Sequence, residues 1–206
     1  MGIQEIMSKA NKGDVKAMEM LGDCYLYGEG VKKDDVKAHK YYMMAAEKGS
    51  IPAKYMVGMD YLTGEGVSKN LSCAETYLTA AANAGLAKAQ YILGLMYQNG
   101  EIGFFSQDKK ACQYFEKAAR QGHGKAQIAL GDAYLEGAGV KQNLGQGLFW
   151  LTCAYLHGQK DAEVGNAAVE RLNALINDNV PGGKERIDDI MDDIKMHYPQ
   201  YIKEPV

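Results

Sequence analysis

Four histidines and four cysteines are the side chains of this sequence best suited to catalysis, metal binding or redox exchange. They are His39, His123, His157 and His197, and Cys24, Cys73, Cys112 and Cys153. No two cysteines form a CxxC pair, and no histidine has a cysteine, serine or carboxylate at a spacing typical of catalytic sites. The HExxH, GxxxxGKS/T and GxSxG motifs do not occur. We therefore expect no catalytic residue, no metal site and no cofactor, and we expect that the chain is not an enzyme.

Charge and hydropathy narrow the classes of partner. The 206 residues carry 23 Lys and Arg against 26 Asp and Glu, a net charge of -3, with no basic block. Nucleic-acid binding normally needs a concentrated positive surface, so we expect none. No apolar run approaches the ~18 residues of a membrane span, and Met1 to Ala10 lack the apolar core of a signal peptide. We expect a cytoplasmic monomer without membrane insertion, or a periplasmic or secreted protein if an export signal had been removed.

The sequence repeats itself at a period of 36 residues. Shifting Asp14 to Gly49 by 36 superposes alanine, glycine and tyrosine positions on one another, and a later one-residue insertion changes the shift to 37. The recurring glycines are Gly22, Gly58, Gly94 and Gly131, and the recurring tyrosines are Tyr25, Tyr61, Tyr97 and Tyr134. So many coincidences at one spacing indicate structural repeats stacked along the chain.

Each repeat reads as two helices joined by a glycine turn. Apolar residues at i, i+3, i+4, i+7 and i+8 from Ala38 to Ala46 form one stripe of an amphipathic helix. Asp34, Asn70 and Asn143 are suitable caps for this second helix, and Gly49 supplies a left-handed residue at its end. The recurring glycine in the middle of each first helix is unfavourable in a helix, so we expect a ring such as Tyr41 to pack over it.

These residues resemble the Sel-one-like repeat (SLR) family, a relative of the tetratricopeptide repeats. The family pattern reads here as Ala17, Leu21-Gly22, Tyr25, Gly28-x-Gly30-Val31, Asp34, Ala38, Tyr41, Ala45-Ala46 and Gly49. The resemblance implies an all-α fold: a right-handed α-solenoid of antiparallel helix pairs, serving as a scaffold or adaptor. Some members have a disulfide between cysteines eight positions apart; this chain lacks that spacing, so we expect free thiols.

We expect one domain over residues 1–206. Its repeats cover about 13–48, 49–84, 85–121 and 122–157, followed by a C-terminal cap over 159–198 and a tail over 199–206. In the cap, the spacing of Ala168, Leu172 and Leu175 predicts a helix to about Asp178. Pro181-Gly182-Gly183 breaks the chain, and we expect a last amphipathic helix carrying Ile187, Ile190, Met191 and Ile194 to cover the end of the core. The alternative is that its apolar face is a docking surface.

The third repeat departs from the pattern, because its turn reads Gly100-Glu101-Ile102-Gly103-Phe104-Phe105. Two interpretations are open. Phe104 replaces the buried valine while the turn bulges, or Phe105 is an exposed contact for a partner.

First helices line the concave side of such a solenoid, so the positions between their core residues are candidates for binding. By analogy with tetratricopeptide grooves, these positions give four rows: Lys16, Glu19, Asp23, Leu26 and Tyr27; Pro52, Tyr55, Met59, Leu62 and Thr63; Lys88, Tyr91, Leu95, Gln98 and Asn99; Lys125, Ile128, Asp132, Leu135 and Glu136. The middle rows are more apolar. Our partner-binding candidates are Tyr27, Tyr55, Met59, Tyr91, Leu95 and Gln98. Leu26, Leu62 and Leu135 recur at one position, and we expect them to pack in the core. For Tyr55, Met59, Tyr91 and Leu95, binding and packing in the core are both open.

Three functions remain open. The first is an adaptor that binds a peptide or a protruding element of a protein on its concave face. The second is a dedicated inhibitor, such as a bacterial toxin immunity protein. The third is an enzyme with a site that the sequence does not reveal.

Overall fold

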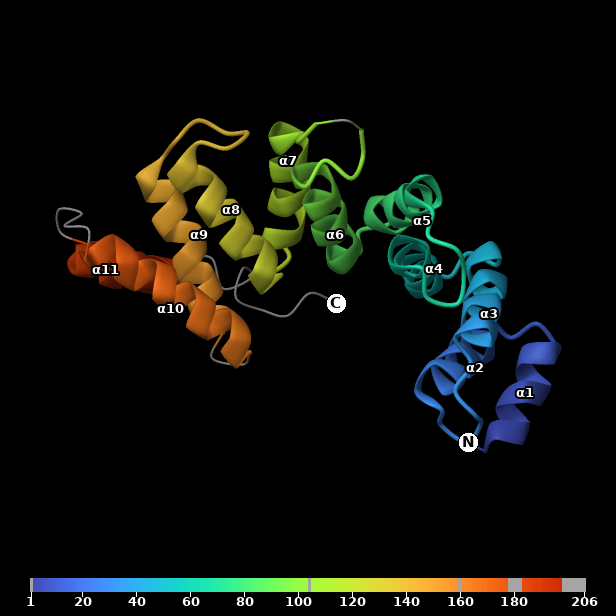
Figure 1. The fold of residues 1–206 in the computed structure, drawn as a ribbon. Coiled ribbons are helices and arrows are strands. Elements are labelled where there is room, and N and C mark those ends of the chain that lie inside the picture. The colour runs from blue at the N-terminus through green and yellow to red at the C-terminus, as the bar shows by residue number, and fades with distance from the viewer. Residues whose placement is uncertain (1, 104, 159–160, 178–182, 198–206) are drawn as a thin grey trace. The chain divides into compact units, whose positions relative to one another are not determined.

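The structure is a computed structural model that describes residues 2–103, 105–158, 161–177 and 183–197, and eleven helices occupy these ranges (Figure 1). Their bounds are α1 Ile3–Asn11, α2 Val15–Tyr27, α3 Asp35–Glu47, α4 Ile51–Thr63, α5 Leu71–Asn83, α6 Ala87–Gln98, α7 Asp108–Ala119, α8 Gly124–Glu136, α9 Leu144–His157, α10 Ala162–Asn177 and α11 Gly183–His197. The pairs α2–α3, α4–α5, α6–α7 and α8–α9 are the four repeats. This confirms the predicted all-α fold of antiparallel helix pairs.

Side-chain caps set where the helices begin. Asp14, Ser50 and His123 precede first helices, and each accepts a hydrogen bond from the backbone N–H three residues later. The second helices α3, α5 and α9 begin after the predicted caps Asp34, Asn70 and Asn143, which accept in the same way. Each bond satisfies a donor that the first turn of a helix leaves unpaired. These caps recur in the pairs α2–α3, α4–α5 and α8–α9 and set the same starting points there, whereas Gln107 before α7 makes no side-chain cap.

Contacts between Cα atoms divide the chain into two compact units, residues 1–89 and 90–206, with the division in the first turn of α6. Each unit has its own core. In the N-terminal unit the core contains Ile6, Leu21, Tyr42, Ala45 and Val57. In the C-terminal unit it contains Leu148, Leu151, Ala168, Leu172 and Ile187.

The glycine in the middle of each first helix makes room for a side chain of the second helix. A Cβ added at Gly22 would lie 2.5 Å from Cε1 of Tyr42, and one added at Gly58 would lie 2.7 Å from Cγ of Leu78. The prediction that Tyr41 fills this place is wrong by one residue. Neighbouring residues of a helix point about 100° apart. Tyr41 therefore points elsewhere and stacks on Tyr25 with ring centroids 5.7 Å apart.

The loop of the third repeat leaves Phe105 83% exposed. This agrees with the exposure that the second interpretation of the loop requires, whereas Phe104 lies outside the described residues. Gln107 fastens the loop, since its Nε2 donates a hydrogen bond to the Ile102 carbonyl at 2.8 Å.

The last two helices pack on the end of the C-terminal core. Ile187 of α11 is 7% exposed and lies in one cluster with Leu172 of α10. Ile190 and Met191 pack against the same cluster. This packing is what a terminal cap requires. The predicted break at Pro181-Gly182, the side chain of Ile194 and the tail over 199–206 lie outside the described residues.

The cysteines are free, as predicted. Cys24, Cys112 and Cys153 are buried, and Cys73 is half-buried. The Cys112 thiol donates a hydrogen bond to the Ala138 carbonyl at 3.1 Å.

Candidate functional site

Residues of the rows predicted on the first helices line one cleft in each unit. The N-terminal cleft has a volume of about 260 Å³ and lies between α2 and α4. Its lining residues are Lys16, Glu19, Asp23, Tyr42, Pro52, Ala53, Tyr55, Met56, Leu86 and Lys88. Five of them, together with Lys88 at the start of α6, belong to the rows predicted from the repeat.

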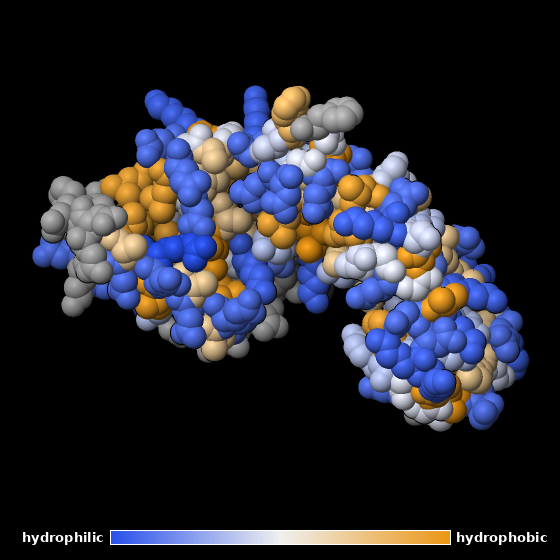
Figure 2. Space-filling model, viewed as in Figure 1, coloured by the Kyte–Doolittle hydropathy of each residue, from blue (hydrophilic) through white to orange (hydrophobic). Residues whose placement is uncertain are grey.

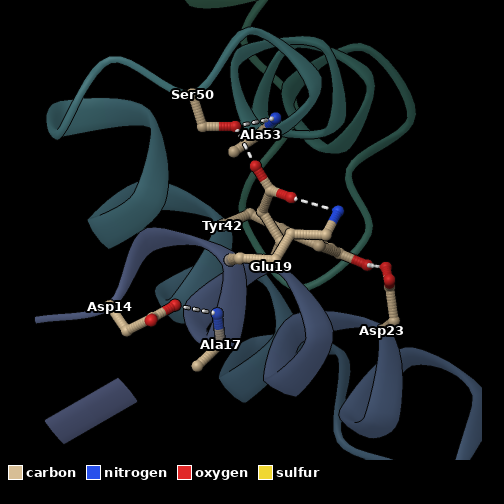
Figure 3. A network of polar contacts seen from close by, with 8 residues as sticks. Asp14, Ala17, Glu19, Asp23, Tyr42, Ser50 and Ala53 are labelled. Atoms are coloured by element: carbon tan, nitrogen blue, oxygen red, sulfur yellow. Dashed lines mark hydrogen bonds and ion pairs between the residues drawn. The ribbon is translucent and has the colours of Figure 1, made fainter. Parts of the chain in front are cut away.

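A hydrogen-bond network fixes the polar wall of the N-terminal cleft (Figure 3). The Ser50 hydroxyl donates to Oε1 of Glu19 at 2.5 Å, and its oxygen accepts from the Ala53 N–H at 3.0 Å. The other Glu19 oxygen accepts from Nζ of Lys16 at 2.8 Å. Glu19 thus links α2 to the beginning of α4, and the carboxylate is held in one orientation.

Tyr42 connects this cleft to the core. Its ring lies over Gly22, and its hydroxyl donates to Oδ1 of Asp23 at 2.7 Å. Burial, and then the hydrogen bond to Asp23, raise the pKa of the Tyr42 phenol. The phenol therefore stays protonated and keeps donating. Asp23 is exposed on the cleft wall but is anchored by a residue that is itself 1% exposed.

The opposite wall of the N-terminal cleft is apolar. Tyr55 and Met56 of α4 are half-buried, and Pro52 is exposed at the edge. Burial raises the pKa of the Tyr55 phenol. Lys88 adds an exposed positive charge at the edge.

The C-terminal cleft, of about 320 Å³, lies among the first helices α6 and α8 and the following helix α10. Its lining residues are Tyr91, Gln98, Lys125, Ile128, Ala129, Asp132, Ala133, Glu136, Ala138, Glu163, Val164, Ala167 and Arg171. On α8 they follow the spacing i, i+3, i+4, i+7, i+8 and i+11, which is a single stripe of the helix.

Two ion pairs join α8 to α10 across this cleft. Nζ of Lys125 lies 2.9 Å from Oε1 of Glu163. Nε of Arg171 lies 3.0 and 2.8 Å from the two oxygens of Asp132, and Nη1 of Arg171 donates to the Ala167 carbonyl at 3.1 Å. Because Arg171 also bonds to its own helix, its guanidinium is held in place above the cleft.

Tyr91 forms the aromatic wall of the C-terminal cleft. Its ring packs on His123, the cap of α8, with centroids 4.7 Å apart, and on Phe115 at 6.0 Å. Burial raises the pKa of the Tyr91 phenol, an effect that the nearby Lys125 opposes. His123 is half-buried; its Nδ1 accepts from the Ala126 N–H at the start of α8, and its ring supports Tyr91.

The predicted partner-binding residues fall into two groups. Tyr55 lines the N-terminal cleft, and Tyr91 and Gln98 line the C-terminal cleft. Met59 and Leu95 are half-buried and line neither, and Tyr27 is 69% exposed outside both. The three leucines that we expected in the core, Leu26, Leu62 and Leu135, are half-buried.

The α10 side of the C-terminal cleft was missed by the sequence reasoning, which treated α10 only as a cap. Glu163, Val164, Ala167 and Arg171 supply this side. One available signal was Ala162, which still fits the alanine position of the repeat and so places α10 where a fifth first helix would lie. Figure 2 shows apolar residues reaching the surface in patches between charged ones, as expected of a surface lined by mixed stripes.

Within the described residues, no group of three or more His, Cys, Asp or Glu side chains could hold a metal ion. No helix in these ranges is long and apolar enough to cross a membrane.

Comparison with solved structures identifies similar proteins. One is c5321, a protective antigen present in uropathogenic Escherichia coli strains and displaying an SLR fold; it is 28% identical, with a TM-score of 0.71 over 92% of this chain and 44% of its own. Another is a Sel1 repeat protein from Oxalobacter formigenes, 30% identical, with a TM-score of 0.69 over 78% of this chain and 65% of its own. This chain thus spans under half of the first and under two thirds of the second.

A third structure shares the fold at lower identity. It is the immunity protein Pa5087 from Pseudomonas aeruginosa, 22% identical, with a TM-score of 0.53 over 97% of this chain and 73% of its own. No curated protein matches the chain.

The Sel1 repeat pattern matches the chain four times, at residues 15–50, 51–86, 87–123 and 124–159. Each match begins two residues after the start that the sequence predicts. Proteins with this repeat are generally protein-interaction scaffolds and are typically not enzymes. With four consecutive matches that cover most of its length, the chain belongs to the Sel1 repeat family.

Proposed function

We propose that this chain is a protein-binding adaptor that receives segments of a partner in the two clefts on its first helices. The observation that carries the proposal is the coincidence of prediction and geometry. Positions that the repeat marks as facing the groove line a cleft in each unit, and each cleft presents a half-buried tyrosine. Tyrosine is enriched at the energetic centres of protein interfaces.

The composition of the clefts favours a peptide or a protein element over a small metabolite. Their volumes of about 260 and 320 Å³ lie below and just above the lower limit of small-molecule sites, which is ~300 Å³. Both combine an apolar wall with charged side chains that are already hydrogen-bonded within the protein. Pre-ordered polar groups around apolar surface are the arrangement of a protein interface, with a dry centre and a polar rim.

The test uses a double variant, Tyr55→Ala with Tyr91→Ala, which removes the aromatic wall of each cleft. Its control is Val36→Ala with Phe105→Ala, which removes exposed apolar side chains (66% and 83% exposed) outside the clefts. Partners captured by the wild-type chain from a lysate of its source are identified, purified and titrated against the three proteins, after their helicity has been compared. We expect the first variant to bind at least ~10-fold more weakly and the control to bind as the wild type does.

The proposal would be overturned if Val36→Ala with Phe105→Ala lost binding while Tyr55→Ala with Tyr91→Ala kept it. Binding would then lie at the Phe105 loop or on the second helices of the repeats. The same titration separates an adaptor from a dedicated inhibitor. An inhibitor binds one partner with a Kd of about 1 nM or below, whereas an adaptor binds several partners more weakly. The similarity to Pa5087 concerns the fold and does not favour either.

A further inference from the structure

The C-terminal cleft is a hollow made by small side chains. Ala129, Ala133 and Ala167 line it where α8 and α10 face one another, and Ile128 and Val164 complete the apolar floor. Ile128 is 8% exposed and Val164 is 3% exposed, whereas Ala129 and Ala167 are half-buried. A bulky apolar side chain from outside would fill the space that the alanines leave and remove their remaining surface from water.

The positive charges around this hollow already have partners. Lys125 pairs with Glu163, and Arg171 pairs with Asp132. Lys125 and Asp132 are seven residues apart on α8, so the two pairs are about 10 Å apart along the helix. They bracket a stretch of floor that can accept one large side chain.

The negative charge at the rim is not balanced in the same way. Glu136 lines the cleft one turn after Asp132, is exposed, and forms no ion pair with another described residue. It is the last residue of α8, whose final turn contains no basic side chain. The C-terminal end of a helix carries a partial negative charge that favours cations. Both contributions make this end of the cleft attractive to a basic group.

The distribution of charge over the chain points the same way. Residues 1–89 contain 11 Lys and Arg and 11 Asp and Glu, whereas residues 90–206 contain 12 and 15. The whole net charge of -3 therefore lies in the C-terminal unit. The linings differ by one charge. In the N-terminal cleft Lys16 and Lys88 are matched by Glu19 and Asp23, whereas in the C-terminal cleft Lys125 and Arg171 stand against Asp132, Glu136 and Glu163. Unlike charges steer partners toward one another, so a basic segment is drawn to the C-terminal unit.

We propose that the C-terminal cleft binds a basic protein segment in which one bulky apolar side chain fills the alanine hollow and one lysine or arginine pairs with Glu136. Ala129 and Glu136 are about 10 Å apart along α8, a distance that three residues of an extended chain cover. The pattern is therefore an apolar residue followed or preceded, three positions away, by a basic one. This inference rests on the proposed function and adds the chemistry of the partner.

The experiment has two stages and uses the full chain. A phage-displayed library of random peptides is first selected on the wild-type protein, and the enriched peptides are synthesised with a fluorescent label. Binding is then measured by fluorescence anisotropy with wild type, Glu136→Lys and Glu101→Lys. Glu101 is exposed in the same unit but does not line the cleft. Glu101→Lys therefore changes the net charge of the unit by the same amount as Glu136→Lys without changing the cleft.

We expect the enriched peptides to carry the apolar and basic pair. We also expect Glu136→Lys to weaken their binding ~10-fold or more, and Glu101→Lys to change it less than ~2-fold. A peptide with glutamate in place of its basic residue should regain affinity for Glu136→Lys. The inference is overturned if no peptide is enriched, if enriched peptides lack basic residues, or if both variants lose affinity equally. These failures leave the adaptor proposal standing, because that proposal depends on the Tyr55 and Tyr91 titration.

Discussion

At the scale of single residues, the glycine inside α2 illustrates how the repeat packs. Gly22 accepts the edge of the Tyr42 ring against its backbone, in a place where a Cβ would lie 2.5 Å from Cε1 and 3.0 Å from Cζ of the ring. An aromatic ring cannot bend away as the end of a lysine could. Glycine is therefore required by the neighbouring helix, against its own poor helix propensity.

Gly22→Ala should lower the free energy of unfolding by about 1–2 kcal/mol. Alanine favours a helix by about 1 kcal/mol, but overpacking a buried contact costs about 1–3 kcal/mol, and Tyr42 must also keep its bond to Asp23. Urea denaturation followed by circular dichroism measures the difference. The matched control is Gly145→Ala in α9, where the added Cβ would meet only Asn143 Oδ1 at 3.4 Å. It should leave stability unchanged or slightly raised, and equal losses in both variants would contradict the packing argument.

The pair of His39 and Asp60 ties α3 to α4. Nδ1 of His39 lies 2.8 Å from Oδ2 of Asp60, and the two side chains are 12% and 8% exposed. His39→Ala leaves a carboxylate buried without its partner, so we expect stability to fall by about 3 kcal/mol. A double-mutant cycle with Asp60→Ala tests this. The double variant should lose clearly less than the sum of the single variants, and simple additivity would show that the pair does not couple the helices.

Buried thiols make stability depend on alkaline pH. Burial raises the pKa of Cys153 and of Cys112. In the unfolded chain both thiols ionise near pH ~8.5, so above that pH only the unfolded state gains by losing the proton. Their stabilising contribution is complete below pH ~8.5 and declines as pH rises beyond it. Between pH ~8.5 and ~10 the free energy of unfolding should fall less steeply for Cys153→Ala than for wild type, by up to about 1.4 kcal/mol per pH unit. Parallel pH profiles would contradict this.

At the scale of helices, periodicity predicted the eight repeat helices, because the same helix caps, apolar stripes and terminal glycines recur in successive copies and support the same helix bounds. It did not predict α1, since a single short segment has no second copy for comparison. Ile6 and Ala10 of α1 are nevertheless 5% and 1% exposed. A Cβ on Gly30 would contact Ile3, whereas one on Gly66 would contact the backbone of Asp35, at the start of a second helix. α1 thus takes the place where the second helix of a preceding repeat would begin.

The clefts could be predicted in part for the same reason. The row positions of α2 and α8 follow from helix geometry, and Lys16, Asp23, Lys125 and Asp132 of the predicted rows line the clefts. Arg171 was missed because the rows were not extended beyond the fourth repeat, although Ala162 keeps the alanine position that would have set the register of α10.

The terminal helix α11 should stabilise the C-terminal unit through one buried side chain. Ile187 is 7% exposed in the core cluster, whereas Met196 of the same helix is 74% exposed. Ile187→Asp buries a charge in apolar surroundings, so we expect a loss of at least about 3 kcal/mol. Met196→Asp introduces the same charge at the surface and should change stability by less than about 0.5 kcal/mol. Thermal unfolding of both variants measures this. If Ile187→Asp unfolded with the stability of the wild type, α11 would not cover the core.

At the scale of the whole chain, the two units have separate hydrophobic cores. In a repeat protein each unit is stabilised mainly by its nearest neighbours, so a local defect opens the chain locally. Hydrogen exchange should therefore be faster in α1 to α4 of Gly22→Ala than in wild type, while amides of α8 to α10 keep their protection. Equal acceleration throughout would mean that the chain unfolds as one cooperative body.

The hydroxyl of Tyr42 has a consequence for how the two clefts can diverge in evolution. The residues that occupy its place in the later repeats are Leu78, Phe115 and Leu151, which have no hydroxyl. Replacing Asp23 by an apolar residue would leave the buried Tyr42 hydroxyl without its acceptor. We therefore expect the sequence of the N-terminal cleft to change as slowly as that of the core. Asp132 is held by Arg171 at the surface, where the pair can be reversed or replaced together. We therefore expect related chains to diversify their partners first through the C-terminal cleft.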